Sequence, residues 1–360
     1  MFMAASLLPL LFAFAPEAND LTGVAVFHSG LAGVHNYRIP AVVQTPDGLV
    51  AFAECRDGGD DSASRIAARV SHDDGASWSN VTFAAGSLDT PAARKACAAN
   101  HTLCRAGNPA AVYDAVERRV VLLHALRGFG LGQDDVGTGM VTSKDGLSWD
   151  PPVDVSADFG AAAGSMPGPG TALQLAAGGQ AGGRLLVVSH HNAYQRDYVT
   201  LSDDGGASWR TVPQDFLKMD EAALTQLPNG SVMLNMRHQA SPKLGRAVAV
   251  SHDAGETWSN ISYDAALVSP VCQASIVSFG GATYFSNPAS KSGRTHLTIK
   301  KSTDSAATWG PELLIEAGAS AGYSCLVKGA LNQHTQSGGI LYEAADGTIK
   351  FARFPLSLEH

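Results

Sequence analysis

The sequence predicts an all-β fold, a six-bladed β-propeller, and three observations carry that prediction. Each of the five tryptophans ends a similar octet, and three copies read S-x-D-x-G-x-x-W, at Ser71–Trp78, Ser202–Trp209 and Ser251–Trp258. Short β-rich runs precede the octets, and a helical period is nowhere sustained. The 38 glycines and 17 prolines are spread along the 360 residues, as in a turn-rich β protein.

The octet makes physical sense as a hairpin turn. Aspartate can accept hydrogen bonds from turn amides, glycine can take a positive φ, and tryptophan can fill the groove beside the turn. The tryptophans are 71, 60, 49 and 51 residues apart, and roughly 340 mature residues at a mean spacing of about 58 give six four-stranded blades. A β-helix or a sandwich is the alternative. Thr142–Trp149, with Asp145 displaced, and Ser302–Trp309, with Ala306 for glycine, depart from the pattern, and we expect less regular turns there.

The first residues and the sequons predict export. Residues 1–18 contain an uncharged apolar run, Ala4 to Ala15, which is too short to span a bilayer and is typical of a cleaved secretory signal. A frayed N-terminal strand is the alternative. Residues 19–360 would then form one propeller domain. We expect a lysosomal or extracellular protein, with peripheral membrane association as an alternative, that carries glycans on at least two of four sequons, at Asn80, Asn100, Asn229 and Asn260.

Charge and cysteine content exclude several classes of function. The net charge is −8 and there is no run of Lys or Arg, so nucleic acid is not an expected partner. Five cysteines cannot form a dense disulfide framework. Cys97 and Cys104 close a short polar loop and are the expected pair. The others lie in apolar runs and are expected to be small buried side chains, at Cys55, Cys272 and Cys325.

Two further turns, Pro46-Asp47-Gly48 and Pro228-Asn229-Gly230, predict hairpins whose open ends carry charged residues. Counting outward from these turns and from Gln333 predicts three pairs that share one rim with the loop of Asp60: Arg38 with Arg56, Glu221 with Arg237, and Tyr323 with Glu343. Arginines that face one cavity repel each other unless an anion joins them, so an acidic substrate is expected. The alternative is a set of ordinary salt bridges at blade ends.

Several motifs resemble those of the sialidases (neuraminidases), most closely the lysosomal type, over nearly the whole mature chain. The octets match the Asp boxes of that family. The other matching motifs are Tyr37-Arg38-Ile39-Pro40, Ala51–Arg56, Pro167–Gly170, Asp220-Glu221, Asn235–Arg237, Tyr284–Pro288, Gly293-Arg294, Gly322–Leu326 and Leu341–Glu343.

The resemblance implies a role for each matching residue. Arg38, Arg237 and Arg294 would grip the substrate carboxylate, with Glu343 orienting Arg38. Arg56 would support this group. Tyr323 would be the nucleophile and Glu221 its partner base. Asp60 would be the general acid/base, with Asp61 as the alternative.

The implied activity is that of a retaining exo-α-sialidase, which removes terminal sialic acid from glycoproteins, glycolipids or oligosaccharides. The expected partner is therefore a sialylated glycan, with no metal and no other cofactor. The adjacent His190 and His191 would point to opposite faces of a strand, which argues against a shared metal ion. A sialic-acid-binding lectin or receptor propeller, and a trans-sialidase, are the alternative functions.

Overall fold

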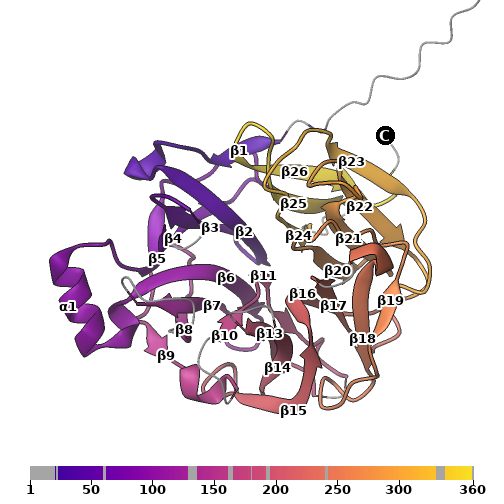
Figure 1. Ribbon diagram of the computed structural model, residues 1–360, viewed down its shortest axis with the longest axis horizontal. Helices are drawn as coiled ribbons and strands as arrows, with labels where there is room; N and C mark the ends of the chain where they lie inside the picture. Colours follow the sequence, from indigo (N-terminus) through magenta and orange to yellow (C-terminus); the bar gives the residue numbers. More distant parts are fainter. Residues whose placement is uncertain are drawn as a thin grey trace, which may run out of the picture.

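The computed structural model describes residues 21, 23–59, 62–128, 136–160, 165–179, 181–191, 195–239, 242–329 and 337–358. The predicted signal segment 1–18, Asp60 and Asp61 lie outside these ranges. Six sheets are arranged as a ring around a central axis (Figure 1). The predicted six-bladed β-propeller is therefore confirmed.

Each of the six sheets in the described ranges is one blade of four or five strands. The first three blades contain β2 (Asn36–Thr45), β3 (Gly48–Arg56), β4 (Ala63–Ser71) and β5 (Thr82–Gly86); then β6 (Arg105–Asp114), β7 (Arg119–Arg127), β8 (Val136–Ser143), β9 (Val153–Asp154) and β11 (Gly170–Thr171); then β10 (Ser165–Pro167), β12 (Leu173–Gln174), β13 (Leu185–His191), β14 (Arg196–Ser202) and β15 (Arg210–Leu217).

The other three blades follow the same plan of four antiparallel strands. They contain β16 (Met219–Gln226), β17 (Val232–His238), β18 (Arg246–Ser251) and β19 (Ser262–Asp264); then β20 (Ser275–Phe279), β21 (Ala282–Pro288), β22 (Leu297–Ser302) and β23 (Glu312–Glu316); then β24 (Ser324–Lys328), β25 (Ser337–Glu343), β26 (Ile349–Pro355) and β1 (Val24–Phe27).

The last blade closes the ring, because its outer strand comes from the other end of the chain. β1 pairs antiparallel with β26, with Val24 opposite Phe351. Hydrogen bonds between the first and last strands therefore hold the ring together, and β26 is not left as an unpaired sheet edge.

The predicted hairpin turns are confirmed at the octets, which connect the last two strands along the sheet in each of the first five blades. In each octet the aspartate accepts a backbone N–H from its own turn, as Asp73 does from Ser77 at 2.8 Å. The turn at Ser302 keeps these bonds although Ala306 replaces glycine: Ala306 has φ +64° and its N–H donates to the Ser302 hydroxyl at 3.0 Å. The expectation of a less regular turn there is wrong. The turn that ends at Trp149 is less regular, as expected. Asp145 accepts the N–H of Ser148, three residues on, whereas Asp73 accepts that of Ser77, four residues on.

The hydrophobic core lies mainly between neighbouring blades. Six clusters of buried residues each join two adjacent blades, and the octet tryptophans pack against phenylalanines at these junctions. Trp78 packs on Phe351, for example, with ring centroids 5.6 Å apart. The octet therefore shapes the turn and also joins blades.

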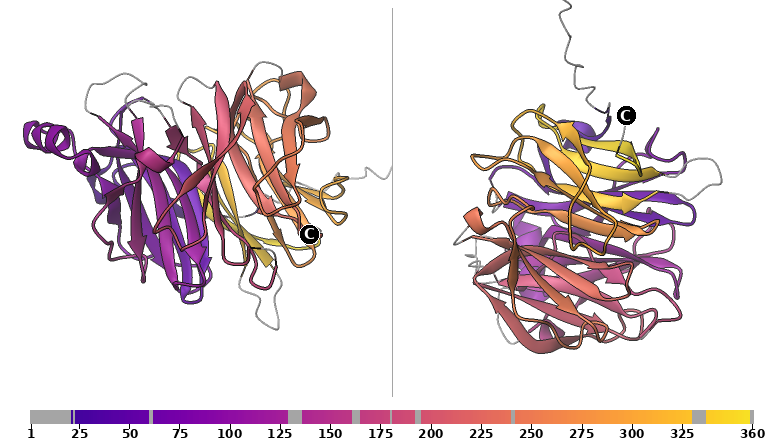
Figure 2. Two further views of the ribbon diagram at one scale, coloured as in Figure 1. Left: turned by 90° about the horizontal axis from the view of Figure 1, so that it is seen from below. Right: turned by 90° about the vertical axis from the view of Figure 1, so that its right-hand side faces the viewer.

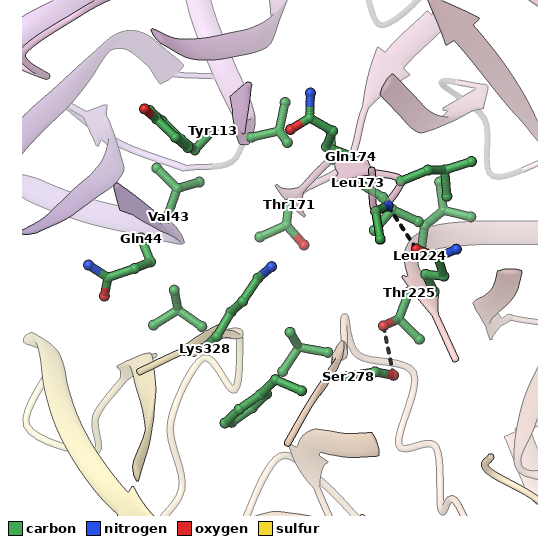
Figure 3. Close-up of a pocket in the computed structure, with 18 of the residues that line it drawn as sticks. Val43, Gln44, Tyr113, Thr171, Leu173, Gln174, Leu224, Thr225, Ser278 and Lys328 are labelled. Atoms are coloured by element: carbon green, nitrogen blue, oxygen red, sulfur yellow. Dashed lines mark hydrogen bonds between the residues drawn. The ribbon is translucent and has the colours of Figure 1, made fainter. Parts of the chain in front are cut away.

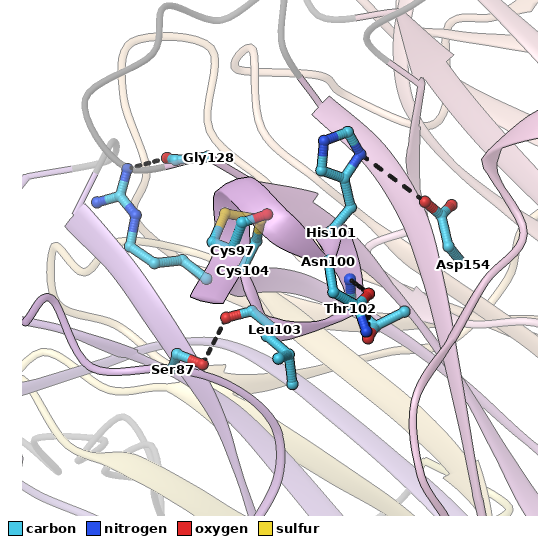
Figure 4. The surroundings of a disulfide bond; sticks show 10 residues. Ser87, Cys97, Asn100, His101, Thr102, Leu103, Cys104, Gly128 and Asp154 are labelled. Atoms are coloured by element: carbon cyan, nitrogen blue, oxygen red, sulfur yellow. Dashed lines mark hydrogen bonds and ion pairs between the residues drawn. A yellow bond between two sulfur atoms is a disulfide. The ribbon is translucent and has the colours of Figure 1, made fainter. Parts of the chain in front are cut away.

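One helix departs from the all-β pattern. α1 (Pro91–Ala99) projects from the ring (Figures 1 and 2) and begins at Thr90, whose hydroxyl accepts the N–H of Ala93. The predicted disulfide is confirmed, since Cys97 of α1 is bonded to Cys104 (Figure 4). Four 3-10 turns complete the secondary structure of the described residues, at Leu31–Gly33, His101–Leu103, Ser156–Asp158 and Pro242–Leu244. Within the described ranges no helix combines the length and apolar character needed to cross a membrane.

Candidate active site

Tyr323 lies where residues from four blades meet. It directly precedes β24, and Glu343 ends the neighbouring strand β25. Arg38 is near the start of β2 in the first blade, and Arg294 lies in the loop between β21 and β22. The fourth blade provides two more residues, Glu221 on β16 and Arg237 on β17. Arg38 and Glu343, which are 305 positions apart, thus come together because the ring is closed.

The hydroxyl of Tyr323 donates to the carboxylate of Glu221. Arg237 Nη1 donates to the other Glu221 oxygen at 2.5 Å and lies 3.4 Å from the Tyr323 hydroxyl. All three residues are buried. Burial and, next, the negative charge of Glu221 raise the pKa of Tyr323 well above its usual range, while Arg237 opposes them. The phenol therefore keeps its proton in this state, and Glu221 is placed to receive it.

Two more buried carboxyl groups, those of Asp220 and Asp197, lie close to Glu221. Asp220 Oδ2 lies 3.1 Å from Arg237 Nε, and burial followed by the charge of Glu221 raises the pKa of Asp220 to about 7. Asp197 of β14 is fully buried, and within the described part of the chain neither of its oxygens has a hydrogen-bond partner. Burial and then the charge of Asp220 raise the pKa of Asp197 well above its usual range. A protonated Asp197 is the form that such surroundings favour.

Glu343 fixes both the tyrosine and an arginine. One carboxylate oxygen accepts Arg38 Nε at 2.5 Å and the N–H of Ile39 at 3.0 Å. The other accepts the N–H of Tyr323 at 2.9 Å. The Glu343 side chain is only 4% exposed, whereas that of Arg38 is 21% exposed. The guanidinium of Arg38 is therefore held from behind while part of it faces solvent.

Backbone carbonyls hold Arg294 in place. Its guanidinium donates to the carbonyls of Ala321 at 2.8 Å and Val271 at 3.0 Å, and among the described residues no carboxylate pairs with it. It lies over the ring of Tyr323, 5.4 Å from the centroid, and Arg38 lies 5.5 Å from the same centroid. Together with Arg237, three guanidinium groups surround one phenol. Such a group favours a bound anion.

Two strained residues support this arrangement. Ile39 has φ +57° and Val271 has φ +58°, values that β-branched residues rarely adopt and that cost on the order of 1–3 kcal/mol each. Ile39 donates its N–H to Glu343, and Val271 gives its carbonyl to Arg294. The strain is therefore located at the backbone atoms that position two of the three arginines.

Known proteins resemble this chain over most of its length. Residues 90–333 match the family model described as a BNR repeat-like domain. The chain belongs to the BNR repeat-like domain family. It is 30% identical over 356 residues to a sialidase of Micromonospora viridifaciens, which covers 91% of this chain and 53% of that protein. It is 27% identical over 339 residues to an exo-alpha-sialidase of Aspergillus fumigatus, covering 82% of this chain and 76% of that protein.

A solved structure agrees with these relatives. A Hadza microbial sialidase superimposes with a TM-score of 0.77 at 25% identity, over 93% of this chain and 68% of that one. The resemblance to the sialidase family that the motifs indicated is thereby confirmed. This BNR repeat-like chain spans about half the length of the Micromonospora protein.

The predicted rim residues Arg38, Glu221, Arg237, Tyr323 and Glu343 of this BNR repeat-like protein come together, with two corrections of register. Arg38 lies opposite Glu54 on β3, and Arg56 lies opposite Asn36. Thr45 pairs with Gly48, so the turn is centred between Pro46 and Asp47, and a bulge between Arg38 and Ala41 shifts the pairing by one more residue. Arg56 donates to Glu54 at 2.6 Å. Similarly, Arg237 lies opposite Asp220, and a bulge places Glu221 beside this pair. The predicted Tyr323–Glu343 neighbours are confirmed, since the N–H of Glu343 donates to the carbonyl of Tyr323.

Sequence reasoning gave no role to Glu54, Asp220 or Asp197. Glu54 and Asp220 lie within the matching motifs Ala51–Arg56 and Asp220-Glu221, which was an available signal. Asp197 lies in β14, and none of the matching motifs contains it. The predicted acid/base, Asp60 or its alternative Asp61, lies outside the described residues.

Histidines do not form a metal centre in the described part of the chain. There, no group of three or more His, Cys, Asp or Glu side chains is arranged to hold a metal ion. His190 is buried, its Nδ1 lies 3.2 Å from the carbonyl of Gly168, and burial lowers the pKa of His190 to about 4. It is therefore neutral, which suits a structural residue beside the site.

Proposed function

We propose that this protein is a retaining exo-α-sialidase that removes terminal sialic acid from glycoproteins, glycolipids or oligosaccharides. One observation carries the proposal: Arg38, Arg237 and Arg294 surround Tyr323, whose hydroxyl is bonded to Glu221. Three guanidinium groups suit a substrate with a carboxylate, and a phenol paired with a base suits a nucleophile. The names of the relatives support the same substrate class.

A neutral nucleophile is what this substrate requires. Sialic acid carries its carboxylate on the anomeric carbon, so an attacking Asp or Glu would meet a like charge. At about 4 Å that repulsion is roughly 1 kcal/mol in water and about 4 kcal/mol at an effective dielectric constant near 20. A phenol avoids this cost, and sialidases with a Tyr nucleophile are a recognised exception to the two-carboxylate scheme.

In the proposed reaction, Arg38, Arg237 and Arg294 bind the substrate carboxylate beside the Tyr323 ring. Tyr323 attacks the anomeric carbon while its proton passes to Glu221, and Arg237 stabilises the negative charge that develops on the phenol oxygen. The bond to the leaving alcohol breaks as Asp60 protonates the glycosidic oxygen. Asp60 then removes a proton from water, which attacks the anomeric carbon of the glycosyl-enzyme. The bond to Tyr323 breaks, and the Tyr323 oxygen takes its proton back from Glu221. Two displacements give overall retention of configuration.

Turnover of a fluorogenic sialoside tests the proposal. The wild-type protein should release the fluorophore, and nuclear magnetic resonance of the first product should show the anomer of the substrate. Tyr323→Phe removes the attacking oxygen but keeps the ring, so it should lose at least a thousandfold in kcat and still bind the sialoside. Binding without turnover by the wild-type protein would indicate a lectin instead, and near wild-type turnover by Tyr323→Phe would exclude this nucleophile.

The substrate carboxylate has its own test. Because Arg294 has no carboxylate partner among the described residues, Arg294→Ala should chiefly raise KM. The matched probe is the methyl ester of the same sialoside. The wild-type protein should discriminate strongly against the ester, and Arg294→Ala should discriminate much less. Equal hydrolysis of acid and ester by the wild-type protein would contradict the proposed role of the arginines.

The proposal extends to the compartment, a lysosomal or extracellular location. The Cys97–Cys104 disulfide is suited to an oxidising environment. The asparagines of all four sequons are exposed, so an acceptor side chain could be glycosylated without unfolding. Expression in a eukaryotic host followed by endoglycosidase digestion should increase gel mobility. Unchanged mobility of the mature protein would count against this location.

A further inference from the structure

A cavity opens at the end of the inner strands opposite Tyr323. The inner strands run from one end to the other: Tyr323 directly precedes β24 and Lys328 ends it, while Arg38 is near the start of β2 and Gln44 near its end. The cavity at the far end has a volume of about 810 Å³ and is lined by inner strands of all six blades (Figure 3). That volume lies in the range of small-molecule binding pockets.

Two polar side chains of the wall, Gln174 and Thr225, have partners within the protein, whereas Gln44 Oε1 is buried and has none among the described residues. Gln174 Nε2 donates to Asp114 at 2.6 Å, and its Oε1 accepts the N–H of Ala115 at 2.8 Å. Thr225 donates to Ser278 at 3.1 Å, one of the bonds drawn in Figure 3. Most of the remaining wall is aliphatic. Contact with this wall would therefore be mainly hydrophobic.

Lys328 brings a positive charge to this largely apolar cavity. Among the described residues that line the cavity, Lys328 is the only charged one, and it forms no ion pair with any described residue. Figure 3 shows its side chain extending from the end of β24 into the middle of the cavity, towards Thr171. Lys328 is exposed, so its ammonium group is accessible to an anion that enters the cavity.

We infer that this cavity binds an amphiphilic monoanion, a carboxylate with an apolar tail. The carboxylate would lie on Lys328 Nζ, and the tail would lie along aliphatic wall residues such as Val43, Leu173 and Leu224. A single ammonium group matches a single negative charge, so polyphosphates and nucleotides do not fit. The site is separate from the arginines around Tyr323, and the inference does not depend on the proposed function.

Titration calorimetry with decanoate, below its micelle concentration and at low salt, tests the inference. The full chain should bind one decanoate. Lys328→Met keeps the length of the side chain but removes its charge, and should weaken binding about tenfold, as expected for loss of a charge-assisted hydrogen bond. Lys328→Arg should restore binding. Lys95→Met, on exposed α1, is the matched control and should bind like the wild type.

Three further measurements distinguish decanoate bound in this cavity from decanoate bound elsewhere on the protein. Methyl decanoate should bind about tenfold more weakly than decanoate, because it lacks the charge. Thr171→Trp should block decanoate by filling the cavity, with its unfolding midpoint measured to show that it folds. Arg294→Ala should bind decanoate unchanged. Equal binding by Lys328→Met and wild type, equal binding of ester and acid, or loss of binding in Arg294→Ala would each overturn the inference.

Discussion

Replacement of Glu343 by Gln should both destabilise the fold and weaken substrate binding. The carboxylate accepts three hydrogen bonds, from Arg38 Nε, Ile39 N and Tyr323 N. A glutamine amide presents one NH₂ group to these donors, so at least one bond becomes a repulsive contact. Breaking a buried ion pair costs about 3–5 kcal/mol. Because Arg38 is 21% exposed and can be partly solvated, we expect about 2–3 kcal/mol.

Urea unfolding and sialoside kinetics measure the two effects. Arg38 should lose its fixed position, so kcat/KM should fall roughly tenfold or more, mainly through KM. Glu312→Gln is the matched control, since Glu312 is 58% exposed and pairs with Lys300 at the surface. It should remain within about 0.5 kcal/mol of wild type. A Glu343→Gln protein as stable as this control, with unchanged KM, would refute the reasoning.

Three further predictions follow from individual features of the fold. The native pKa of Asp197 is raised above its ordinary 3.8, so the native state holds a proton that the unfolded chain releases. The free energy of unfolding should therefore fall as pH rises above that ordinary value, and Asp197→Asn should remove up to about 1.4 kcal/mol per pH unit of that slope in urea titrations. An unchanged slope would contradict the raised pKa. The double variant Cys97→Ser, Cys104→Ser should speed hydrogen exchange in α1 and leave turnover unchanged. A disulfide that closes so short a loop contributes about 2–3 kcal/mol to local stability. Unaltered exchange would show that the disulfide adds nothing. Ala306→Gly should raise the free energy of unfolding by up to about 1 kcal/mol, because alanine adopts φ +64° there. A lower unfolding midpoint would show that the methyl group contributes more than the strain costs.

The architecture was predictable because the octets mark the same turn in five blades. Trp78 and its counterparts fix the spacing of the blades, and the chain length supplies the sixth. Counting outward from the hairpin turns also predicted which charged residues share one rim. Both kinds of signal are local, so they are visible in the sequence.

What the sequence did not reveal depends on register and on distant contacts. The bulges after Arg38 and Asp220 shift pairings by a residue or two, and nothing near those positions marks an extra residue. The position of Asp197 behind Asp220 depends on how two blades pack, which no motif records. α1 was missed although Thr90 and Pro91 form a helix start signal, because the helix is short and stands off the ring.

The central claim is that the oxygen of Tyr323 bonds to the sugar during turnover. Incubation with a 3-fluorosialosyl fluoride, which forms a glycosyl-enzyme rapidly and releases it slowly, followed by peptide mass spectrometry, tests this directly. We predict one covalent sialosyl group on Tyr323 in the wild-type protein and none in Tyr323→Phe. A label on Glu221 or another carboxylate, or turnover of this reagent without any labelled peptide, would contradict the claim.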